Sequence, residues 1–360
     1  MKKALSVISG EGYKILFSKE AYGALHLLLK TENYSSVYIL VDNHTQMHCL
    51  PTFLGHLSEL KKVDILKIRA GEENKDLKTC QVIWQELSEL GADRKSLLIN
   101  LGGGVVTDLG GFVAGAFKRG IDFVNVPTTL LSMVDASVGG KTGVDLGGLK
   151  NQIGIITHPR MVIIDVNYLS TLPENEYRSG YAEMLKHGII RDKNYFEQLS
   201  QYKSPENSDI EDYIHHSILI KNAVVSEDLY ESNFRKILNF GHTLGHAIET
   251  HCLNNSQKTT LLHGEAIAIG IITETHLSTQ LCGLEMAVAK EIKEVFLRIF
   301  PKSSFSEKDL VDIINFLRHD KKNSHGKVKF VLIQGLGQPA IDIEVASENL
   351  IEAFKFYQQD

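Results

Sequence analysis

The segment LINLGGGVVTDLGGFVAGAF (98–117) runs from a short apolar strand through three consecutive glycines into a helix of small residues. Glycines let the backbone approach a phosphate closely, and the helix N-terminus behind them favours an anion. The spacing is neither G-x-G-x-x-G nor that of a P-loop. A plain tight turn is the alternative, but the position directly after an apolar strand favours phosphate binding.

Similar apolar segments surround this one and define the fold class. They are short and rich in β-branched residues: SVYILVD (36–42), VDILKI (63–68), IDFVNV (121–126) and MVIID (161–165). A helical pattern, LKTCQVIWQELSELGA (77–92), separates two of the strands. This alternation predicts an α/β N-terminal nucleotide-binding domain with a mostly parallel sheet and helices on its faces. Ligands of such sheets bind beyond the carboxyl ends of the strands.

The second half of the chain has a different texture. After about Tyr168 helical patterns dominate, and only KVKFVLIQG (327–335) reads as a strand. The segment LSTLP (169–173) is a plausible junction, because Pro173 does not fit the middle of a helix. We therefore predict two domains, an α/β domain over 1–168 and a mainly α-helical domain over 169–360.

Composition excludes several classes of protein. The 360 residues carry a net charge of -6, which gives no general attraction to nucleic acid or anionic lipid. No signal peptide and no apolar stretch of about 18 residues is evident. The cysteines are scattered without a C-x-x-C pair, which argues against disulfides and thiolate zinc sites. We expect a cytoplasmic protein. The cysteines are Cys49, Cys80, Cys252 and Cys282.

The segment VPTTLLSMVDASVGGKTGVDLGGLKNQIG (126–154) is too rich in glycine and polar residues for a strand. Thr128 and Thr129 offer hydroxyls, and Lys141 and Lys150 lie in glycine-rich backbone. A surface loop with solvated lysines is the alternative. Because long loops in compact domains usually have a function, we favour phosphate or carboxylate binding.

A metal site is the most specific chemical hypothesis. His242 and His246 are four residues apart, on one face of a helix, and His263 begins an apolar helix. Glu183, in RSGYAEMLKHG, adds a carboxylate, and such a set suits Zn²⁺. For each histidine alone, a hydrogen-bonded core residue is the alternative. Spacing does not decide which two of the three bind metal.

Six ordered motifs carry a family resemblance: LGGGVVTDLGGF, VPTTLLSMVDASVGGKTG, LKNQIG, GYAEMLKHG, RKILNFGHTLGHAIE and LLHGEAIAIG. Over about Asp42 to Lys322 the chain resembles 3-dehydroquinate synthase, of the sugar-phosphate cyclase family. The resemblance implies that 3-deoxy-D-arabino-heptulosonate 7-phosphate becomes 3-dehydroquinate and phosphate. The steps are transient oxidation by NAD, β-elimination, re-reduction and aldol closure. It further implies a carbon–oxygen lyase of the shikimate pathway that uses NAD and Zn²⁺, with Co²⁺ possible, and forms a homodimer without nucleic-acid or membrane partners.

The resemblance also assigns roles to residues. The metal ligands are Glu183, His242 and His263, so the histidine pair four residues apart is split between two roles. The NAD-binding positions are Asp42, Glu72, Lys75, Gly103, Gly104, Val105, Asp108, Thr128, Thr129, Lys141, Lys150, Tyr168, Thr171 and Leu172. The substrate-binding positions are Arg119, Asp135, Lys141, Asn151, Lys186, Lys221, Arg235, Asn239, His246 and Lys322, or its neighbour Lys321, which closes over the site. The catalytic positions are Asp135, Lys186, Glu231, Asn239 and His246, with Asp135, Glu231 and His246 as candidates for relaying a proton.

Some positions depart from the family pattern. Thr107 stands where a small residue is usual in the glycine loop, and Met133 stands where glutamine is frequent. The run GAFKRG replaces a more common tyrosine-methionine-arginine run. Arg119, Lys150 and Asn151 are retained, so we expect an intact site, with Thr107 the departure that bears on the cofactor.

Three other functions compete with this one. A polyol dehydrogenase of the glycerol dehydrogenase type has no need of so many phosphate-directed cations. A cyclase that makes an inosose or valiolone ring acts on a substrate without a carboxylate, and Arg235 and Asn239 favour 3-dehydroquinate synthase over it. A non-catalytic NAD or metal sensor requires no set like Lys186, Arg235 and His246.

Overall fold

The computed structural model describes residues 5–57, 63–147, 149–204, 206–319 and 328–359. They form two compact units, Met1–Pro173 with Pro205–Asn222, and Glu174–Ser204 with Ala223–Asp360. The domain boundary expected after residue 168 stays a prediction. Lys321 and Lys322, the candidate closing residues, lie outside the described residues.

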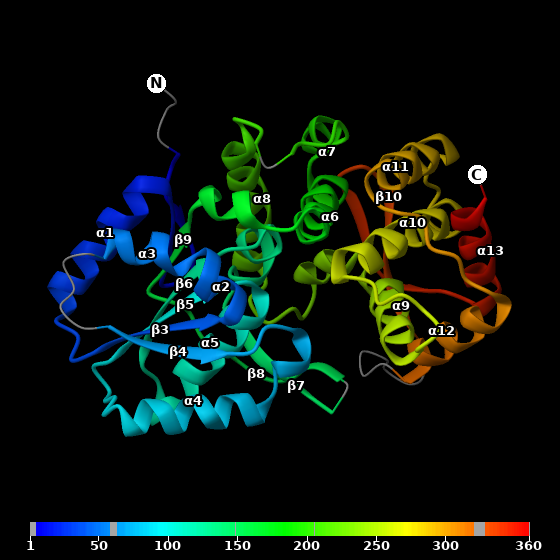
Figure 1. Cartoon of the computed structure of the whole chain (residues 1–360). Coiled ribbons are helices and arrows are strands. Elements are labelled where there is room, and N and C mark those ends of the chain that lie inside the picture. The colour runs from blue at the N-terminus through cyan, green and yellow to red at the C-terminus, as the bar shows by residue number, and fades with distance from the viewer. Residues whose placement is uncertain (1–4, 58–62, 148, 205, 320–327, 360) are drawn as a thin grey trace. The chain divides into compact units, whose positions relative to one another are not determined.

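A seven-stranded sheet in the order β1-β2-β9-β6-β5-β3-β4 forms the centre of the first unit (Figure 1). Only the β1–β2 pair is antiparallel in this described sheet. The strands are β1 (Ile8–Ser9), β2 (Lys14–Phe17), β3 (Val37–Asp42), β4 (Asp64–Ile68), β5 (Leu97–Gly102), β6 (Asp122–Pro127) and β9 (Met161–Ile164). The predicted α/β class with a mostly parallel sheet is therefore confirmed.

Helices cover both faces of this sheet, with α1 and α3 on one side and α4 and α5 on the other (Figure 1). Small residues let α5 lie against the strands, since a Cβ added to Gly110 would be 2.0 Å from Asn100 Oδ1. Leu109 and Val113 are completely buried there. The helices are α1 (Ser18–Glu32), α2 (Asn43–His48), α3 (Leu50–His56), α4 (Leu77–Glu89) and α5 (Gly104–Ala116), with the 3₁₀ turns η1 (Glu72–Asn74), η2 (Phe117–Arg119) and η4 (Val166–Thr171).

The segment 126–154 is not the long loop that its composition suggests. It contains a π-helical turn, η3 (Ser132–Ala136), and a hairpin of β7 (Lys141–Leu146) and β8 (Leu149–Ile156). Gly143 pairs with Gly154, and a Cβ added to Gly143 would lie 2.5 Å from the Ile153 carbonyl oxygen. The expectation of a loop is wrong because these glycines, which lower strand propensity, allow the two backbones to approach closely.

The second unit is mainly helical, as predicted, and α10 (His263–Leu281) runs through its middle (Figure 1). Helices α6, α9, α11 and α13 all pack against α10. The other elements are α6 (Glu174–Arg191), α7 (Lys193–Leu199), η5 (Phe234–Asn239), α9 (His242–Asn254), α11 (Met286–Ile299), α12 (Glu307–His319), α13 (Ser347–Gln358), and the hairpin of β10 (Lys329–Gly335) and β11 (Gln338–Glu344). Strand β11 is missing from the sequence prediction. One further helix, α8 (Ile210–Glu227), lies largely in the first unit.

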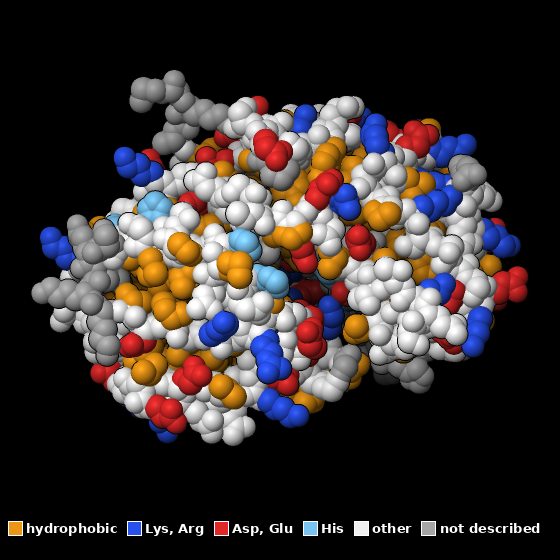
Figure 2. Space-filling model, viewed as in Figure 1, with side chains coloured by type: hydrophobic (Ala, Val, Ile, Leu, Met, Phe, Trp, Pro, Cys, Tyr) orange, Lys and Arg blue, Asp and Glu red, His pale blue; other side chains and the backbone are white. Residues whose placement is uncertain are grey.

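Two surface properties complete the description. Among the described residues, no helix combines the length and the apolar character that crossing a membrane requires. Histidine side chains gather on the first unit over α2 and α3 (Figure 2), where His44, His48 and His56 are exposed. These histidines belong to a different unit from the candidate metal ligands.

Candidate active site

The glycine loop has the geometry of an anion cradle. Strand β5 ends at Gly102 and α5 begins at Gly104, with Gly103 as a helix cap that has no side chain to bond the first turn. A Cβ added to Gly103 would lie 2.9 Å from the Thr129 side chain, and one on Gly102 would lie 2.5 Å from Val106. The loop therefore requires glycine, and its backbone N–H groups at the start of α5 suit a phosphate.

Thr107 fits beside this loop because its side chain bonds to the local backbone. The side chain is buried, and its hydroxyl lies 3.3 Å from the carbonyl oxygens of both Gly103 and Gly104. It therefore forms its hydrogen bonds within α5, as threonines inside helices do. The departure from the family pattern is accommodated by the helix itself.

Lys75 organises a charged cluster from the predicted cofactor and substrate positions. Its buried ammonium donates to Asp108 Oδ2 and Asn151 Oδ1, each at 2.8 Å, and lies 3.6 Å from Glu72. Lys150 lies 3.8 Å from the same Glu72 carboxylate. Burial opposes the charge on Lys75, but Asp108 and Glu72 outweigh it and raise the pKa of Lys75. The structure thus brings five sequence-predicted residues together.

Other predicted cofactor residues follow the carboxyl ends of parallel strands, as the fold requires. Asp42 ends β3 and caps α2, accepting from the His44 and Thr45 N–H groups at 2.8 and 2.7 Å. Thr128 and Thr129 follow β6, and the Thr128 N–H donates to the Gly102 carbonyl at 3.0 Å. Further along, η4 carries Tyr168 and Thr171, with Leu172 as its C-cap, and Val105 lies in the first turn of α5.

The substrate-binding positions of the first unit fall into two groups. Lys221 on α8 donates to the backbone carbonyl of Asp135 at 2.6 Å and is ion-paired with the Asp135 carboxylate. Arg119 and Lys141 are exposed cations. Arg119 has a φ of 72°, a left-handed conformation that is uncommon outside glycine.

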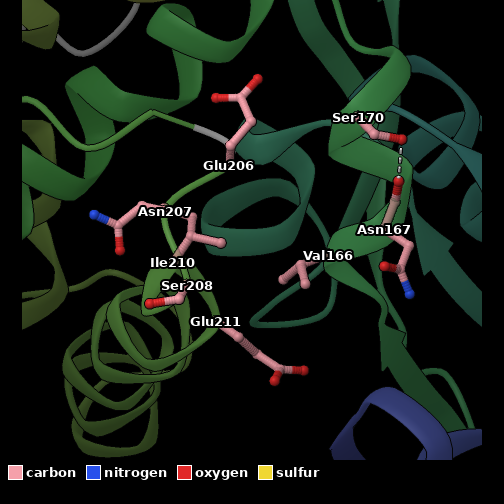
Figure 3. Close-up of a pocket in the computed structure, with 8 residues that line it drawn as sticks. All are labelled: Val166, Asn167, Ser170, Glu206, Asn207, Ser208, Ile210 and Glu211. Atoms are coloured by element: carbon pink, nitrogen blue, oxygen red, sulfur yellow. Dashed lines mark hydrogen bonds between the residues drawn. The ribbon is translucent and has the colours of Figure 1, made fainter.

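A separate pocket of about 330 Å³ lies in the first unit between η4 and the start of α8 (Figure 3). No sequence-predicted site residue lines it. The lining residues are Val166, Asn167, Ser170, Glu206, Asn207, Ser208, Ile210 and Glu211. We therefore exclude this pocket from the candidate site.

Three histidines converge in the second unit. Each of His242, His246 and His263 offers one ring nitrogen, and these three atoms lie within 4.8 Å of one another. The first two come from the start of α9 and the third opens α10. The structure thus brings together all three histidines, although their spacing in the sequence did not show which two bind a metal ion.

Glu183 supplies a carboxylate next to one of these histidines, His242. It is completely buried on α6, and neither oxygen has a well-formed hydrogen bond to any described residue, although Oε2 is ion-paired with Lys186. Glu183 Oε1 lies 3.4 Å from His242 Nε2. Lys186 balances the charge at Oε2, but Oε1 is buried without a hydrogen bond to a described residue, and a bound cation would satisfy it.

The tautomer and the lowered pKa of His242 also indicate a bound cation. Its Nδ1 lies 3.2 Å from the Phe240 carbonyl, so Nδ1 carries the proton and Nε2 presents a lone pair. Burial lowers the pKa of His242 well below its ordinary value, and the charge of Lys186 lowers it further. A lone pair and a carboxylate oxygen therefore face each other, and a divalent metal ion fits between such groups.

Glu249 orients the second imidazole and is absent from the sequence-predicted set. Its Oε2 lies 3.3 Å from His263 Nδ1, which leaves Nε2 of His263 to act as a ligand. The signal was present in the sequence, because Glu249 is seven residues after His242 and three after His246, on the same helical face. The sequence did not show that His263 packs against this face.

The remaining predicted site residues of the second unit form hydrogen bonds within that unit. Lys186 donates to the Leu238 carbonyl at 2.7 Å, and Arg235 donates to the Leu229 carbonyl at 2.7 Å. Asn239 Nδ2 donates to Glu231, whose backbone has a φ of 57°. These contacts hold cationic and amide groups in defined places.

Comparisons with known proteins agree with this chemistry. The family model described as 3-dehydroquinate synthase N-terminal matches residues 65–179, and the corresponding C-terminal model matches residues 180–323. The chain belongs to the 3-dehydroquinate synthase family. The resemblance and the function that it implied are thereby confirmed.

Individual relatives of the 3-dehydroquinate synthase family cover nearly the whole chain. The 3-dehydroquinate synthase of Parabacteroides distasonis is 38% identical over 96% of this chain and 98% of its own. That of Clostridium beijerinckii is 36% identical over 95% of this chain and 98% of its own. Full-length coverage at this identity extends the family assignment to both units.

Solved structures share the fold. A 2-deoxy-scyllo-inosose synthase complexed with carbaglucose-6-phosphate, NAD+ and Co2+ has a TM-score of 0.85 at 24% identity, covering 98% of this chain and 99% of its own. The 2-epi-5-epi-valiolone synthase of Streptomyces hygroscopicus, with NAD+ and Zn2+ bound, has a TM-score of 0.84 at 23% identity, with both chains fully covered. At this identity these likenesses define the fold alone.

Proposed function

We propose that this chain converts 3-deoxy-D-arabino-heptulosonate 7-phosphate to 3-dehydroquinate and phosphate, as a carbon–oxygen lyase that uses NAD and a divalent metal ion. One observation carries the proposal. The buried carboxylate of Glu183 has Lys186 as its ion-pair partner at Oε2, and its Oε1 faces the lone pair of His242 Nε2, whose ring nitrogen lies close to that of His263. A dehydroquinate synthase requires a cation at such a place.

The metal ligands are Glu183, His242 and His263, and Zn²⁺ or Co²⁺ suits this set. When bound, the metal supplies a Lewis acid that lowers the pKa of a substrate hydroxyl. Glu249 holds His263 in the tautomer that presents Nε2. His246 carries the third converging nitrogen and is left to contact the substrate.

NAD belongs to the first unit in this proposal. The glycine loop before α5 holds the pyrophosphate, and the cluster of Lys75, Asp108 and Glu72 fixes the neighbouring backbone. Bound NAD supplies a hydride acceptor that is restored within each turnover, so no net NADH forms. The solved cyclases described with NAD+ support this assignment.

The chain's cations recognise a substrate with two anionic groups. Arginine suits bidentate contact with phosphate or carboxylate, and lysine acts as a point charge. Their anchoring differs, because Lys186, Lys221 and Arg235 are buried and already bonded to backbone carbonyls, whereas Arg119 and Lys141 are exposed. The buried cations hold a fixed orientation, which limits the substrate to one conformer.

Proton movement falls to three side chains. His246 accepts the proton of the reacting hydroxyl and later returns it. Asp135, whose charge is balanced by Lys221, and Glu231, which accepts from Asn239 Nδ2, are the other candidates for moving this proton. Asn239 therefore also positions the Glu231 carboxylate.

We further propose a homodimer in the cytoplasm. The family resemblance motivates the dimer. The free thiols of all four cysteines fit a reducing compartment.

The test is incubation of the purified protein with the heptulosonate phosphate and NAD+, with and without a metal chelator. We expect stoichiometric phosphate and 3-dehydroquinate without accumulation of NADH, and loss of both products with chelator. Accumulation of NADH without phosphate would instead identify a simple dehydrogenase. A matched His246→Gln variant should bind Zn²⁺ normally but turn over at least about 100-fold more slowly, in the range for loss of a general acid–base group.

A further inference from the structure

Helix α9 begins without a cap of its own. Its N-cap, Gly241, has a φ of 80° and no side chain to bond the first-turn N–H groups. A larger residue does not fit, because a Cβ on Gly241 would lie 2.4 Å from the Ile271 side chain. The helix that carries His242 and His246 thus starts at a point where an ordinary Ser, Thr or Asp cap is excluded.

Glu274, on the neighbouring helix α10, fills this gap. Its carboxylate is completely buried and accepts from the Gly241 N–H at 2.6 Å and from the Leu244 N–H at 3.0 Å. These are the cap and third positions of α9, the N–H groups that a capping side chain and its box partner normally satisfy. A negative charge is also stabilised at a helix N-terminus.

The two hydrogen bonds bracket His242, the first residue of α9. The ring of His242 is tied to the same stretch of backbone through the Phe240 carbonyl. The backbones of α9 and α10 also lie very close, since a Cβ on Gly270 would be 2.0 Å from the Gly241 carbonyl oxygen. A shift in residues 241–244 would therefore move His242 Nε2 away from Glu183.

We propose that Glu274 is a positioning residue that caps α9 from α10 and pre-forms the metal site. The inference rests on the proposed function, because it assumes that His242 is a metal ligand. Glu274 acts through the backbone of α9 rather than by touching the metal or substrate.

The test is the Zn²⁺ dissociation constant of folded protein, measured by competition with a chromophoric chelator. Glu274→Gln keeps the shape but replaces one acceptor oxygen with an NH₂ group that opposes a backbone N–H. We expect it to weaken Zn²⁺ binding about 10- to 100-fold, the range for partners of metal ligands, while NAD+ binding stays within about twofold of wild type. Wild-type Zn²⁺ affinity in this variant would overturn the proposal.

Asp192→Ala is the matched control. Asp192 caps α7 in the same unit, accepting from the Tyr195 N–H at 3.1 Å. We expect this variant to unfold at a lower temperature but to retain wild-type Zn²⁺ affinity. An equal loss of affinity in both variants would show a general effect of destabilisation and would overturn the specific role of Glu274.

Hydrogen exchange in the wild-type protein provides a test that does not depend on a folded variant. With metal removed, we expect peptides covering 240–246 to exchange slowly before Zn²⁺ is added. Fast exchange that slows only with Zn²⁺ would overturn pre-formation. Unchanged Zn²⁺ affinity in a His263→Ala variant would instead refute the proposed metal site itself. Failure of the proposed function can therefore be distinguished from failure of the role of Glu274.

Discussion

Gly270→Ala is the substitution whose effect follows most directly from the packing of α9 on α10. A Cβ at this position would lie 2.0 Å from the Gly241 carbonyl oxygen and 2.8 Å from the Gly245 nitrogen, both rigid backbone atoms. In real proteins a Cβ atom essentially never lies within 3.0 Å of an atom that belongs to neither its own residue nor the two residues next to it in the chain. The two helices must therefore separate by about 1 Å, and His242 and His246 would move away from His263.

The expected cost has two parts. Overpacking of this kind destabilises a protein by about 1–3 kcal/mol, which thermal unfolding measures. A 1 Å misplacement of catalytic groups costs about 10²-fold in rate, which the phosphate-release assay measures. Metal affinity should fall as well, since metal–ligand distances tolerate only about ±0.2 Å.

Gly23→Ala is the control, because a Cβ on this α1 residue meets nothing within 4 Å. It should leave activity unchanged and stabilise the protein slightly, by roughly 0.4–1 kcal/mol. A Gly270→Ala protein with wild-type activity and Zn²⁺ affinity would refute the reasoning that close α9–α10 packing sets the metal site.

Three other substitutions test separate parts of the account. Glu249→Gln should weaken Zn²⁺ binding about 10- to 100-fold in chelator competition, because it loosens His263; unchanged affinity would remove Glu249 from the site. Lys75→Met should raise the Kd of NAD+ and destabilise the protein by about 1–3 kcal/mol in urea unfolding, since it leaves the partly buried Asp108 without its cation; a loss below about 0.5 kcal/mol would contradict this. Asp228 accepts from the Asn233, Ser232 and Arg235 N–H groups, which lower its pKa to about 2. The stability that it contributes is therefore complete above its unfolded pKa of about 4 and is lost as the pH falls towards 2, so Asp228→Asn should flatten the stability curve between those values; an unchanged curve would count against it.

Much of the fold could be predicted from local sequence pattern. Buried parallel strands are short and apolar, as residues 37–42 and 97–102 show, and the first of these two segments is also rich in β-branched residues. The hairpin of β7 and β8 could not be predicted, because its facing glycines Gly143 and Gly154 carry no strand signal. Strand β11 begins with Gln338 and Pro339, which also obscure its character.

The candidate site was predictable as a set of residue types but not as a structure. The convergence of His242, His246 and His263 agrees with their common interpretation as site residues. The roles of Glu249 and Glu274 depend on how α9 packs against α10, a tertiary relation that no spacing within one helix encodes. Glu274 in particular lies 33 residues from Gly241, within a helix that otherwise reads as apolar.

The proposed active site depends on a metal ion that is held by one carboxylate and two imidazoles. Crystals grown with Zn²⁺ and measured on both sides of the zinc absorption edge test it most directly. We predict a single strong anomalous peak bonded to Glu183, His242 and His263, with His246 outside the coordination sphere. A peak bonded to His242 and His246 without Glu183, or no peak near these residues, would contradict the account.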